Sequence, residues 1–488
     1  MFDSGTSLDP SDWESLRVQS HRMLDDMLDY VSQIRQAPVW QPAPADVVSV
    51  FNAPLPSASQ SLKVVHDSFM QNILPFAIGN AHPGFMGWVH GGGSVVGMLA
   101  EMLAAGLNSN LGGRDQIPIQ VEQQVVRWMQ QLFGFPESAS GLFVTGSSMA
   151  NLIGLLVART AKLGTEVRGK GLQQVNEHLV AYTSSDSHSC LERAMEIAGM
   201  GGHQLRKIQV DDRHQMNLHA LRENIEHDRA LGLTPFCIIG TAGTVNVGAI
   251  DDLQAIAEIA HAEAMWFHVD GACGALGMMS AKIGSKMTGI QQADSLALDF
   301  HKWGQVPYDA GFILVRDSQL HLDTFASSAD YLRRETEGMA AGSPWPCDFG
   351  PDLSRSFKAL KVWFTMQVFG SDRLAKMMER SCELAEYLAS RIQASEELEL
   401  LAPVNLNIVC FRYRCESADR VNAKIVVAIQ ESGIAAPSST TIHGKFAIRA
   451  ALFNHRTSRG EIDNLVTAAL RLGRSIQKNL EVTECNFQ

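Results

Sequence analysis

The chain has 488 residues, of which 45% are hydrophobic and 19% charged, a composition typical of a soluble α/β enzyme with two or three packed units. Its net charge of -12 and its lack of any basic run argue against a nucleic-acid partner, because phosphate backbones require a basic face. No stretch reaches the roughly 18 continuous apolar residues of a membrane span. No membrane contact is therefore expected.

The eight cysteines are scattered along the chain without a Cys-x-x-Cys pair or metal-ligand spacing. We therefore expect reduced thiols, with neither a disulfide framework nor a bound metal. The first thirty residues are acidic and amphipathic, without a positively charged start before an apolar core, so they do not resemble a secretory signal. Together these features predict a cytoplasmic protein.

The opening segment has helical and proline-rich parts. Residues 10–36 carry apolar side chains at helical spacing, and Ser11 stands three residues before Glu14 in the pattern of a capping box. The connector at 37–48 contains several prolines, so we expect neither helix nor central strand there. Residues 1–80 are too few to hold a core of their own, which predicts a helical arm that packs against another subunit.

Short β-rich runs alternate with helical stretches over residues 81–371. The runs are continuously apolar, which is typical of a parallel sheet that is buried on both faces. We therefore predict a large α/β domain with a mainly parallel sheet, whose functional residues follow the carboxyl ends of the strands. The expected strands contain the sequences LFVT, LVAYTS, FCIIG, WFHVD, LALD and FILV.

The last part of the chain repeats the β/α theme on a smaller scale. A long helix over 353–370 leaves the large domain, and we predict a small C-terminal α/β domain over 372–488. Its expected elements are strands within 399–414 and 446–454 and helices over 418–433 and 458–476.

Three small residues, Gly146, Ser147 and Ser148, lie between an apolar run and a helix. Their N–H groups and hydroxyls would point at whatever lies over the start of that helix, favourably an anion. An ordinary N-cap explains the same pattern, and this segment alone favours the cap.

Asp270 follows the strand-like run MWFHVD. A carboxylate at the end of a buried strand is costly unless a cation meets it, and a protonated pyridine nitrogen would serve. The small residues Gly271 and Ala272 would leave room for a flat ring over the backbone. A helix cap or an ion-paired aspartate explains Asp270 equally well until Lys302 is considered.

Lys302 stands beside His301 in an otherwise apolar stretch, where an unpaired ammonium would be costly. A solvated turn is one explanation, and a Schiff base with a carbonyl cofactor is the other. Asp270 and Lys302 together are the two electronic handles that pyridoxal phosphate needs. His188 ends another strand-like segment, where its imidazole could stack on a pyridine ring, although core or surface roles are commoner for histidine.

The chain resembles the pyridoxal-phosphate-dependent group II amino acid decarboxylases in the motifs HPGFMGW, GSSMANL, SDSHSCLERA, GTAGTVNVGAIDDL, HVDGACG, DFHKWGQVPYDAG and LSRSFKALKVWF. The resemblance runs from about residue 10 to residue 475. It implies fold type I, with a seven-stranded sheet in the large domain. It also implies a homodimer in which the N-terminal arm wraps the partner and the active sites lie at the subunit interface.

The resemblance assigns a role to each matching residue. Lys302 would hold the cofactor as an internal aldimine, Asp270 would pair with the pyridinium nitrogen, and His188 would stack on the ring. The other implied contacts are Gly146, Ser147 and Ser148 at the phosphate with Asp299 and His301 nearby, Thr241 near the ring substituents and Ala272 near the other face of the ring.

Tyr331 matches the tyrosine of the family's mobile catalytic loop, which reaches the other subunit's site. Its phenol could protonate the quinonoid carbanion that remains after carbon dioxide leaves. Relatives with phenylalanine at this position tend to make aldehydes oxidatively, so Tyr331 favours an amine product. Without the resemblance, an exposed aromatic residue in a polar loop would be the simpler explanation.

Substrate choice depends on two less typical segments. Trp88 keeps one large ring where aromatic relatives have a more aromatic segment, but His90 and the glycines at 91–93 replace the rest. Arg114 could bind an acidic side chain bidentately, or it could simply pair with Asp115 on the surface.

We therefore expect a pyridoxal-phosphate-dependent carboxy-lyase that converts an L-amino acid, with aromatic substrates somewhat favoured, into the amine and carbon dioxide. Three alternatives stay open. They are oxidative deamination to an aldehyde, decarboxylation of acidic or diamino acids, and a catalytically silent cofactor-binding scaffold.

Overall fold

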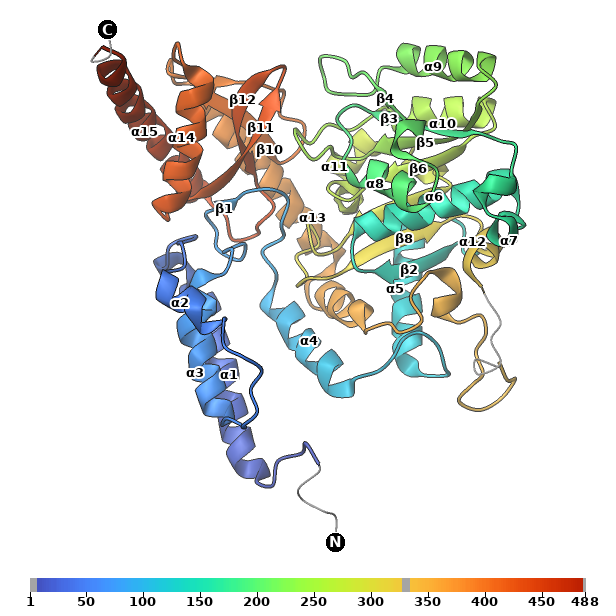
Figure 1. Cartoon of the computed structure of the whole chain (residues 1–488), viewed down its shortest axis with the longest axis horizontal. Helices are drawn as coiled ribbons and strands as arrows, with labels where there is room; N and C mark the ends of the chain where they lie inside the picture. The colour runs from blue at the N-terminus through green and yellow to red at the C-terminus, as the bar shows by residue number, and fades with distance from the viewer. Residues whose placement is uncertain (1–6, 327–333, 486–488) are drawn as a thin grey trace.

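The computed structural model describes residues 7–326 and 334–485, which form two lobes joined by one long helix (Figure 1). The larger lobe holds a seven-stranded sheet and the smaller lobe a five-stranded sheet. An arm of helices from the start of the chain projects below the smaller lobe in this view.

The large sheet consists, in spatial order, of β2 (Ser140–Val144), β8 (Gly311–Val315), β7 (Ser295–Asp299), β6 (Trp266–Asp270), β5 (Thr234–Thr241), β3 (Leu179–Ser184) and β4 (Leu205–Ile208). The strands from β7 to β4 run parallel, whereas β8 is antiparallel to both of its neighbours. Every residue of β3, β7 and β8 is buried, which explains their continuous apolar runs. The prediction of a mainly parallel seven-stranded sheet is confirmed.

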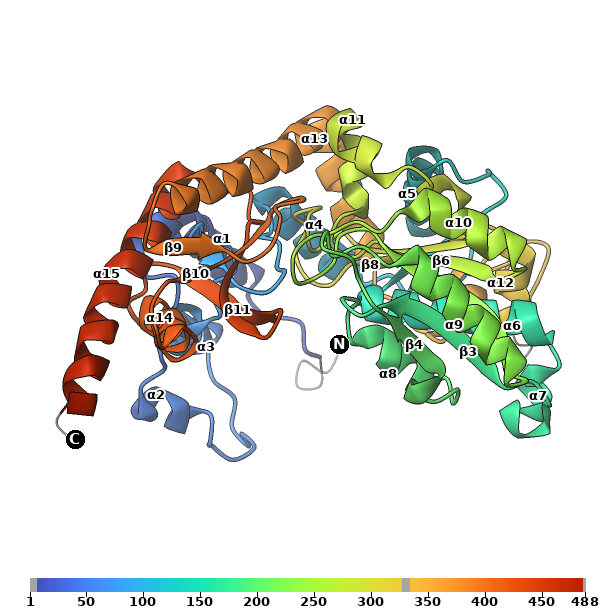
Figure 2. The ribbon, with the colours of Figure 1, turned by 90° about the horizontal axis from the view of Figure 1, so that it is seen from above.

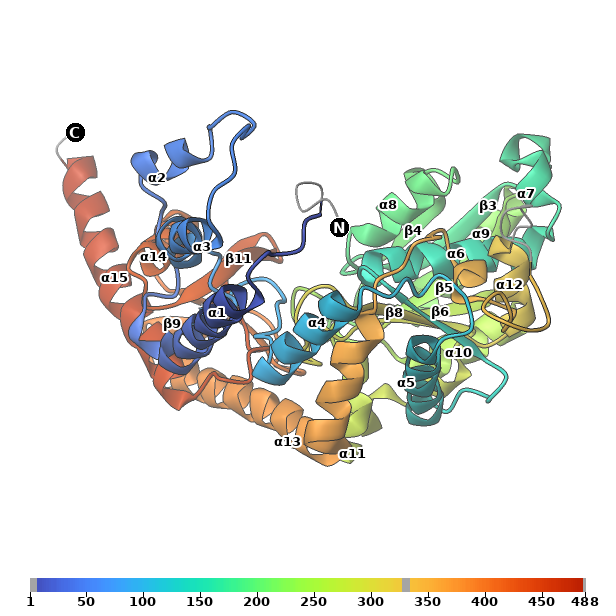
Figure 3. The ribbon, with the colours of Figure 1, turned by 90° about the horizontal axis from the view of Figure 1, so that it is seen from below.

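Helices cover both faces of this sheet. Figures 2 and 3 show α6 (Ser147–Leu163) on one side and α10 (Leu253–Ala262) on the other. Because α6 begins three residues after β2 ends, the Gly146–Ser148 segment lies at a strand-to-helix junction. The other helices of the large lobe are α4 (Val95–Leu107), α5 (Ile117–Phe133), α7 (Val167–Lys170), α8 (Cys190–Ile197), α9 (Leu218–Ala230), α11 (Ala281–Gly284) and α12 (Ser318–Phe325).

The small sheet has the order β1 (Phe85–Met86), β11 (Ala436–Ile442), β12 (Lys445–Ala451), β10 (Ile408–Tyr413) and β9 (Leu398–Leu400). The pair β1 and β11 is parallel, and the other pairs are antiparallel. Helix α14 (Ala418–Glu431) packs against this sheet and against α15 (Arg459–Cys485). A segment from the start of the predicted large domain therefore completes the small sheet, and the predicted boundaries near residues 80 and 371 stay predictions.

The two lobes are joined by α13 (Lys358–Gln393), which spans both of them in Figures 2 and 3. The helix is broken at Gly370, whose backbone angles are φ 71° and ψ 159°. A left-handed φ of this kind favours glycine, because a Cβ would strain the backbone there. The segment that leaves the large lobe and the segment that supports the small lobe can therefore differ in direction.

The arm contains α1 (Trp13–Gln33), α2 (Ala45–Val50) and α3 (Leu62–Asn72), and α1 lies against α3. The predicted Ser11 capping box is wrong, because Asp12 caps α1 by accepting bonds from the N–H groups of Glu14 and Ser15. The prediction that the 37–48 connector contains no helix is also wrong. Pro44 is the N-cap of α2, and a proline at that position does not hinder the residues that follow it.

Across residues 7–326 and 334–485, no helix has the length and apolar character needed to cross a bilayer. Free thiols are found at Cys190, Cys237, Cys273, Cys347, Cys382, Cys410 and Cys415. The predicted cytoplasmic location stays a prediction.

Candidate active site

A cavity of about 410 Å³ opens at the carboxyl ends of β3, β5, β6 and β7, which is where a parallel sheet places its functional groups. All ten residues that were predicted to contact the cofactor line it. The complete lining is Thr145, Gly146, Ser147, Ser148, His188, Thr241, Gly243, Val245, Asp270, Ala272, Cys273, Asp299, His301, Lys302 and Tyr308.

Lys302 is held by a buried carboxylate. Its Nζ lies 2.9 Å from Oδ2 of Asp299 at the end of β7. Burial lowers the pKa of Lys302, but the charge and hydrogen bond of Asp299, together with the neighbouring Cys273 and Asp270, outweigh it, so the net pKa is raised. Burial also raises the pKa of Asp299, and the charges of Lys302 and His301 reverse this to a net decrease. The pair fixes the direction of the lysine side chain.

Asp299 also binds Ser147, at the start of α6. The Ser147 backbone N–H donates to Oδ1 and the Ser147 hydroxyl donates to Oδ2, both at 2.7 Å. Both donors of Ser147 are therefore bound to Asp299, whereas the resemblance implied that Ser147 binds the phosphate. Gly146 and Ser148 line the cavity on either side and are the better candidates for a phosphate contact.

Asp270 ends β6 on the wall of the cavity and is only 3% exposed. Its Oδ1 accepts a hydrogen bond from the Ala272 N–H at 3.2 Å. Burial raises the pKa of Asp270, and the nearby charge of Lys302 compensates only in part. A cation placed in the cavity beside Asp270 would therefore stabilise the ionised carboxylate.

His188 lies at the mouth of the same cavity. Its Nδ1 accepts a hydrogen bond from the Cys190 N–H at 3.1 Å, so a neutral ring carries its proton on Nε2. Burial against the cavity wall lowers the pKa of His188, which favours this neutral form. The Nε2–H group is free to donate toward a ligand.

Several aromatic rings extend from the cavity toward the small lobe. Tyr308 lines the cavity and contacts the ring of His301, with 4.3 Å between ring centroids and a tilt of 36°. His90 lies 5.7 Å from Tyr308 and 6.2 Å from Trp88. Phe85 of β1 contacts the rings of both Trp88 and His90. Trp88 and His90 therefore lie beyond the cavity wall, and Tyr308 connects them to it.

Tyr308 was not predicted as a site residue. It stands six residues after Lys302 in the same loop, and a second aromatic residue so close to a cofactor lysine is a usable signal. Burial raises the pKa of Tyr308 to about 12, so its phenol keeps its proton at neutral pH.

Arg114 stands apart from this cavity. The guanidinium of Arg114 lies over the ring of Trp345, 4.4 Å from its centroid, and no ion pair with Asp115 is found among the described residues. Arg334 lies over the same ring at 3.5 Å. Tyr331 lies outside the described residues, so its role stays a prediction.

Asp251 is a second residue near the site that the sequence motifs did not predict. It is 2% exposed and accepts hydrogen bonds from the backbone N–H groups of Met216 (2.7 Å) and Thr241 (2.8 Å). It thereby holds the end of β5, where Thr241 meets the cavity. The sequence holds one clue to Asp251, since two adjacent aspartates, Asp251 and Asp252, precede a helix. Only one of them can be its N-cap, which is Asp252, so Asp251 is left for another role.

Replacing Asp251 with asparagine is expected to change how stability depends on pH. Burial raises the pKa of Asp251 to about 6 in the folded protein, above the value of about 3.9 for an unfolded chain. Protonation therefore favours folding, and this contribution is lost as the pH rises through 6. The free energy of unfolding of the wild type relative to Asp251→Asn should fall by about 2 kcal/mol between about pH 4 and pH 7. Denaturant titrations measure this, and a difference that is constant with pH would contradict it.

The lining groups fit pyridoxal phosphate. The hydroxyl of Thr241 is buried in the wall and has no hydrogen-bond partner, which leaves it free for a ligand. The buried carboxylate of Asp270 requires a cation, and Lys302 supplies an amine. Among the residues that the structure describes, no group of three or more His, Cys, Asp or Glu side chains could hold a metal ion.

Comparison with known proteins identifies one family. Residues 44–414 match the family described as the pyridoxal-dependent decarboxylase conserved domain. An aromatic-L-amino-acid decarboxylase of Bacillus atrophaeus is 33% identical over 463 residues, which are 92% of this chain and 93% of that protein. A phenylacetaldehyde synthase of Arabidopsis thaliana is 27% identical and covers 92% and 94%.

A solved structure shows the same fold. It is the glutamate decarboxylase domain of a diaminobutyrate-pyruvate transaminase and L-2,4-diaminobutyrate decarboxylase from Vibrio parahaemolyticus. It superimposes with a TM-score of 0.85 at 27% identity, over 96% of this chain and 97% of that one. These relatives differ in substrate and in product, so the substrate has to be inferred from the site.

Proposed function

Because the chain belongs to the pyridoxal-dependent decarboxylase family, with the type I fold and pyridoxal phosphate as its cofactor, we propose that it converts an aromatic L-amino acid into the amine and carbon dioxide. The convergence of Lys302, Asp270 and His188 in one cavity, beside a row of aromatic rings, carries this proposal.

Each residue at the cavity has a proposed task. Bound pyridoxal phosphate would supply a sink for the electron pair that stays on the α-carbon when carbon dioxide leaves. Lys302 holds the cofactor covalently through its amine, aimed by Asp299, and Asp270 keeps a positive charge on the ring nitrogen. His188 donates its Nε2–H to the substrate carboxylate or stacks on the ring. Gly146 and Ser148 hold the phosphate, and Thr241 and Ala272 contact the ring.

The aromatic residues that extend from the cavity toward the small lobe favour a substrate with an aromatic side chain over one with an acidic side chain. Trp88 and His90 form a row of ring contacts with Tyr308, which lines the cavity. Burial together with the charge of Lys302 lowers the pKa of His90, so that its imidazole is neutral. Arg114, the residue considered for an acidic substrate, instead contacts Trp345. Aromatic pairs add about 0.5–1.5 kcal/mol beyond their buried area.

A survey of carbon dioxide release tests the substrate class. We expect aromatic L-amino acids to exceed L-glutamate and L-2,4-diaminobutyrate in kcat/KM by about tenfold or more. Trp88→Ala should reduce turnover of the aromatic substrates, whereas the matched variant Arg114→Ala should affect aromatic and acidic substrates equally. A preference for acidic or diamino acids would reject the aromatic assignment, and no release from any amino acid would reject the activity.

Tyr331 decides between amine and aldehyde in this proposal. Its phenol would protonate the α-carbon after carbon dioxide leaves, while the closed site excludes water. Tyr331→Phe should lower the amine yield by about a hundredfold and shift the product toward aldehyde, with hydrogen peroxide and ammonia released. Amine output equal to that of the wild type would remove the proton-donor role. An aldehyde product from the wild type would favour the oxidative alternative.

A homodimer is the proposed assembly. The arm exposes apolar side chains that would be poorly placed in water, which supports a partner surface for it. They are Leu8, Trp13, Val18, Val48, Val50, Phe51, Leu55, Leu62, Val64, Val65, Ile73 and Ile78. A partner subunit that covers the arm would explain why this segment contributes so little to either core.

A further inference from the structure

Beside the break in α13 lies a second, smaller cavity that the decarboxylation site does not include. It has a volume of about 150 Å³, the size that holds a benzene molecule. Its lining is Ser94, Gln305, Thr365, Phe369, Arg373, Leu374, Met377 and His455. Thr365 and Phe369 precede Gly370 and the other α13 residues follow it, so both segments of α13 contribute to the cavity.

One wall of this cavity carries a polar atom without a partner. Thr365 is 2% exposed, and its hydroxyl forms no hydrogen bond. A buried hydroxyl without a partner costs free energy, because it has lost water and gained nothing in exchange. The other buried polar groups are already bound, since Ser94 accepts from the Gly97 N–H and His455 bonds to the Gly93 carbonyl. The Thr365 hydroxyl is therefore available to a ligand.

The charge around the cavity is positive. Arg373 contacts the ring of Phe369 at 5.2 Å and pairs with no carboxylate in the described parts of the chain. Burial, together with the charges of Arg456 and Arg380, lowers the pKa of His455 to about 4, so this ring is neutral. An anion would find the exposed guanidinium of Arg373 together with the apolar side chains of Leu374 and Met377 in the same lining.

Gln305 separates this cavity from Lys302. It is 4% exposed, and its amide nitrogen donates to the carbonyl oxygens of Lys302 (3.2 Å) and Phe453 (2.6 Å). Its amide oxygen accepts from the Gly92 N–H at 3.1 Å. A ligand in the cavity would thus touch a side chain that braces the backbone of the cofactor lysine.

We propose that this cavity binds a small monocarboxylate with an apolar body, about the size of benzoate. The carboxylate pairs with Arg373 and accepts a hydrogen bond from Thr365, while the apolar body packs on Phe369, Leu374 and Met377. Because the ligand contacts both segments of α13 as well as Gln305, its binding is coupled to the position of Lys302.

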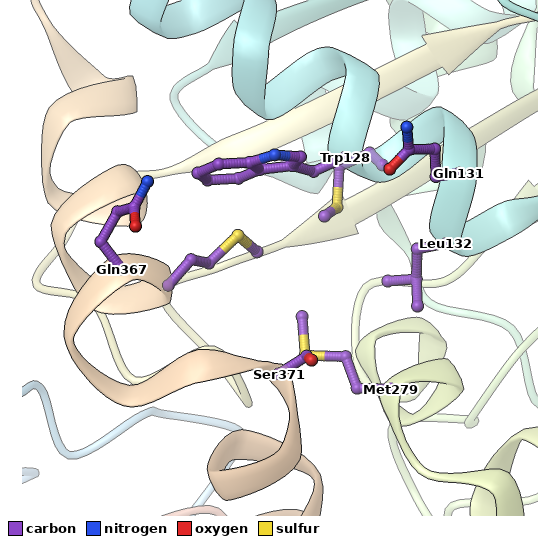
Figure 4. A pocket seen from close by; sticks show the side chains of 8 residues that line it. Trp128, Gln131, Leu132, Met279, Gln367 and Ser371 are labelled. Carbon is purple, nitrogen blue, oxygen red and sulfur yellow. The ribbon is translucent and has the colours of Figure 1, made fainter.

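A larger cavity near α13 lacks these polar features. It has a volume of about 440 Å³ and lies between α5 and α13, where Trp128, Met279 and Gln367 surround it (Figure 4). None of its lining side chains has a buried polar atom without a partner, and none is charged. It therefore offers a carboxylate no specific contact, and we assign no ligand to it.

Calorimetric titration of the holoenzyme with benzoate tests the proposal. We expect one molecule to bind per chain, and benzyl alcohol to bind much more weakly because it lacks the charge. Arg373→Ala and Thr365→Val should each weaken benzoate binding by about tenfold, the loss of one charge-assisted contact. The control Arg471→Ala, which removes an exposed arginine of α15, should bind as the wild type does.

Two further measurements keep the result unambiguous. Thr365→Val should leave the midpoint of thermal unfolding unchanged or raised, because the hydroxyl that it removes has no partner. A shift of the cofactor's visible absorption on benzoate addition, lost in both variants, would report the coupling to Lys302. Absence of binding, or binding that survives both substitutions and is displaced by an amino acid substrate, would overturn the proposal. Specific binding in a protein that decarboxylates nothing would instead reject only the proposed function.

Discussion

Replacing Lys302 with alanine is expected to abolish covalent attachment of the cofactor and to reduce amine formation by at least about a thousandfold. The amine of Lys302 is the group in the cavity that can condense with an aldehyde, and Asp299 holds it in place at 2.9 Å. Borohydride reduction of the wild type should fix the cofactor on the peptide that contains Lys302. Mass spectrometry of wild type and variant measures this directly.

The same substitution should also destabilise the protein, and a second variant separates the two effects. Removing the cation leaves the buried carboxylate of Asp299 without its ion pair, a change that costs about 3–5 kcal/mol. Lys302→Arg keeps a cation beside Asp299 but cannot condense with an aldehyde. Lys302→Arg should therefore regain most of the stability that Lys302→Ala loses, but it should not attach the cofactor covalently. Cofactor that is still fixed by borohydride in Lys302→Ala would refute the assignment.

Asp270→Asn is the second substitution with a large expected effect. The amide has nearly the same shape as the carboxylate but cannot balance a positive charge on the cofactor ring nitrogen. Because that charge draws electrons from the breaking bond, kcat should fall by about a hundredfold to ten-thousandfold, and the cofactor should bind more weakly. Steady-state kinetics and a titration of the apoprotein with pyridoxal phosphate measure both effects.

Although kcat should fall in Asp270→Asn, the free energy of unfolding of the apoprotein should not. Burial raises the pKa of Asp270, so the ionised carboxylate destabilises the cofactor-free protein at neutral pH. The apoprotein of Asp270→Asn should therefore unfold at the same denaturant concentration as the wild type or at a higher one. Asp294→Asn is the matched control. Burial also raises the pKa of Asp294, but this residue lies just before β7, away from the cavity. Equal loss of kcat in both variants would show that Asp270 has no special role.

Local sequence patterns were sufficient to place much of the site. Continuous apolar runs predicted the strands β3, β5, β6, β7 and β8, and the polar residues that follow such runs converge because parallel strands end at one edge. Family resemblance then assigned a chemistry to that edge, and the comparisons confirm the family, the cofactor and the fold. The N-cap of α1 and the helix after Pro44 were predicted wrongly, because several residues in each segment could have met the same local requirement.

By itself, the sequence determined which residues stand at strand ends and helix starts, since a strand's periodicity and a helix's cap depend on neighbours within a few positions. Only the tertiary structure decided that Ser147 serves Asp299 and that β1 completes the small sheet. It also decided that Arg114 contacts Trp345. These partners lie far apart along the chain, and packing and hydrogen-bond satisfaction in the folded state select them from many residues with the same local propensities.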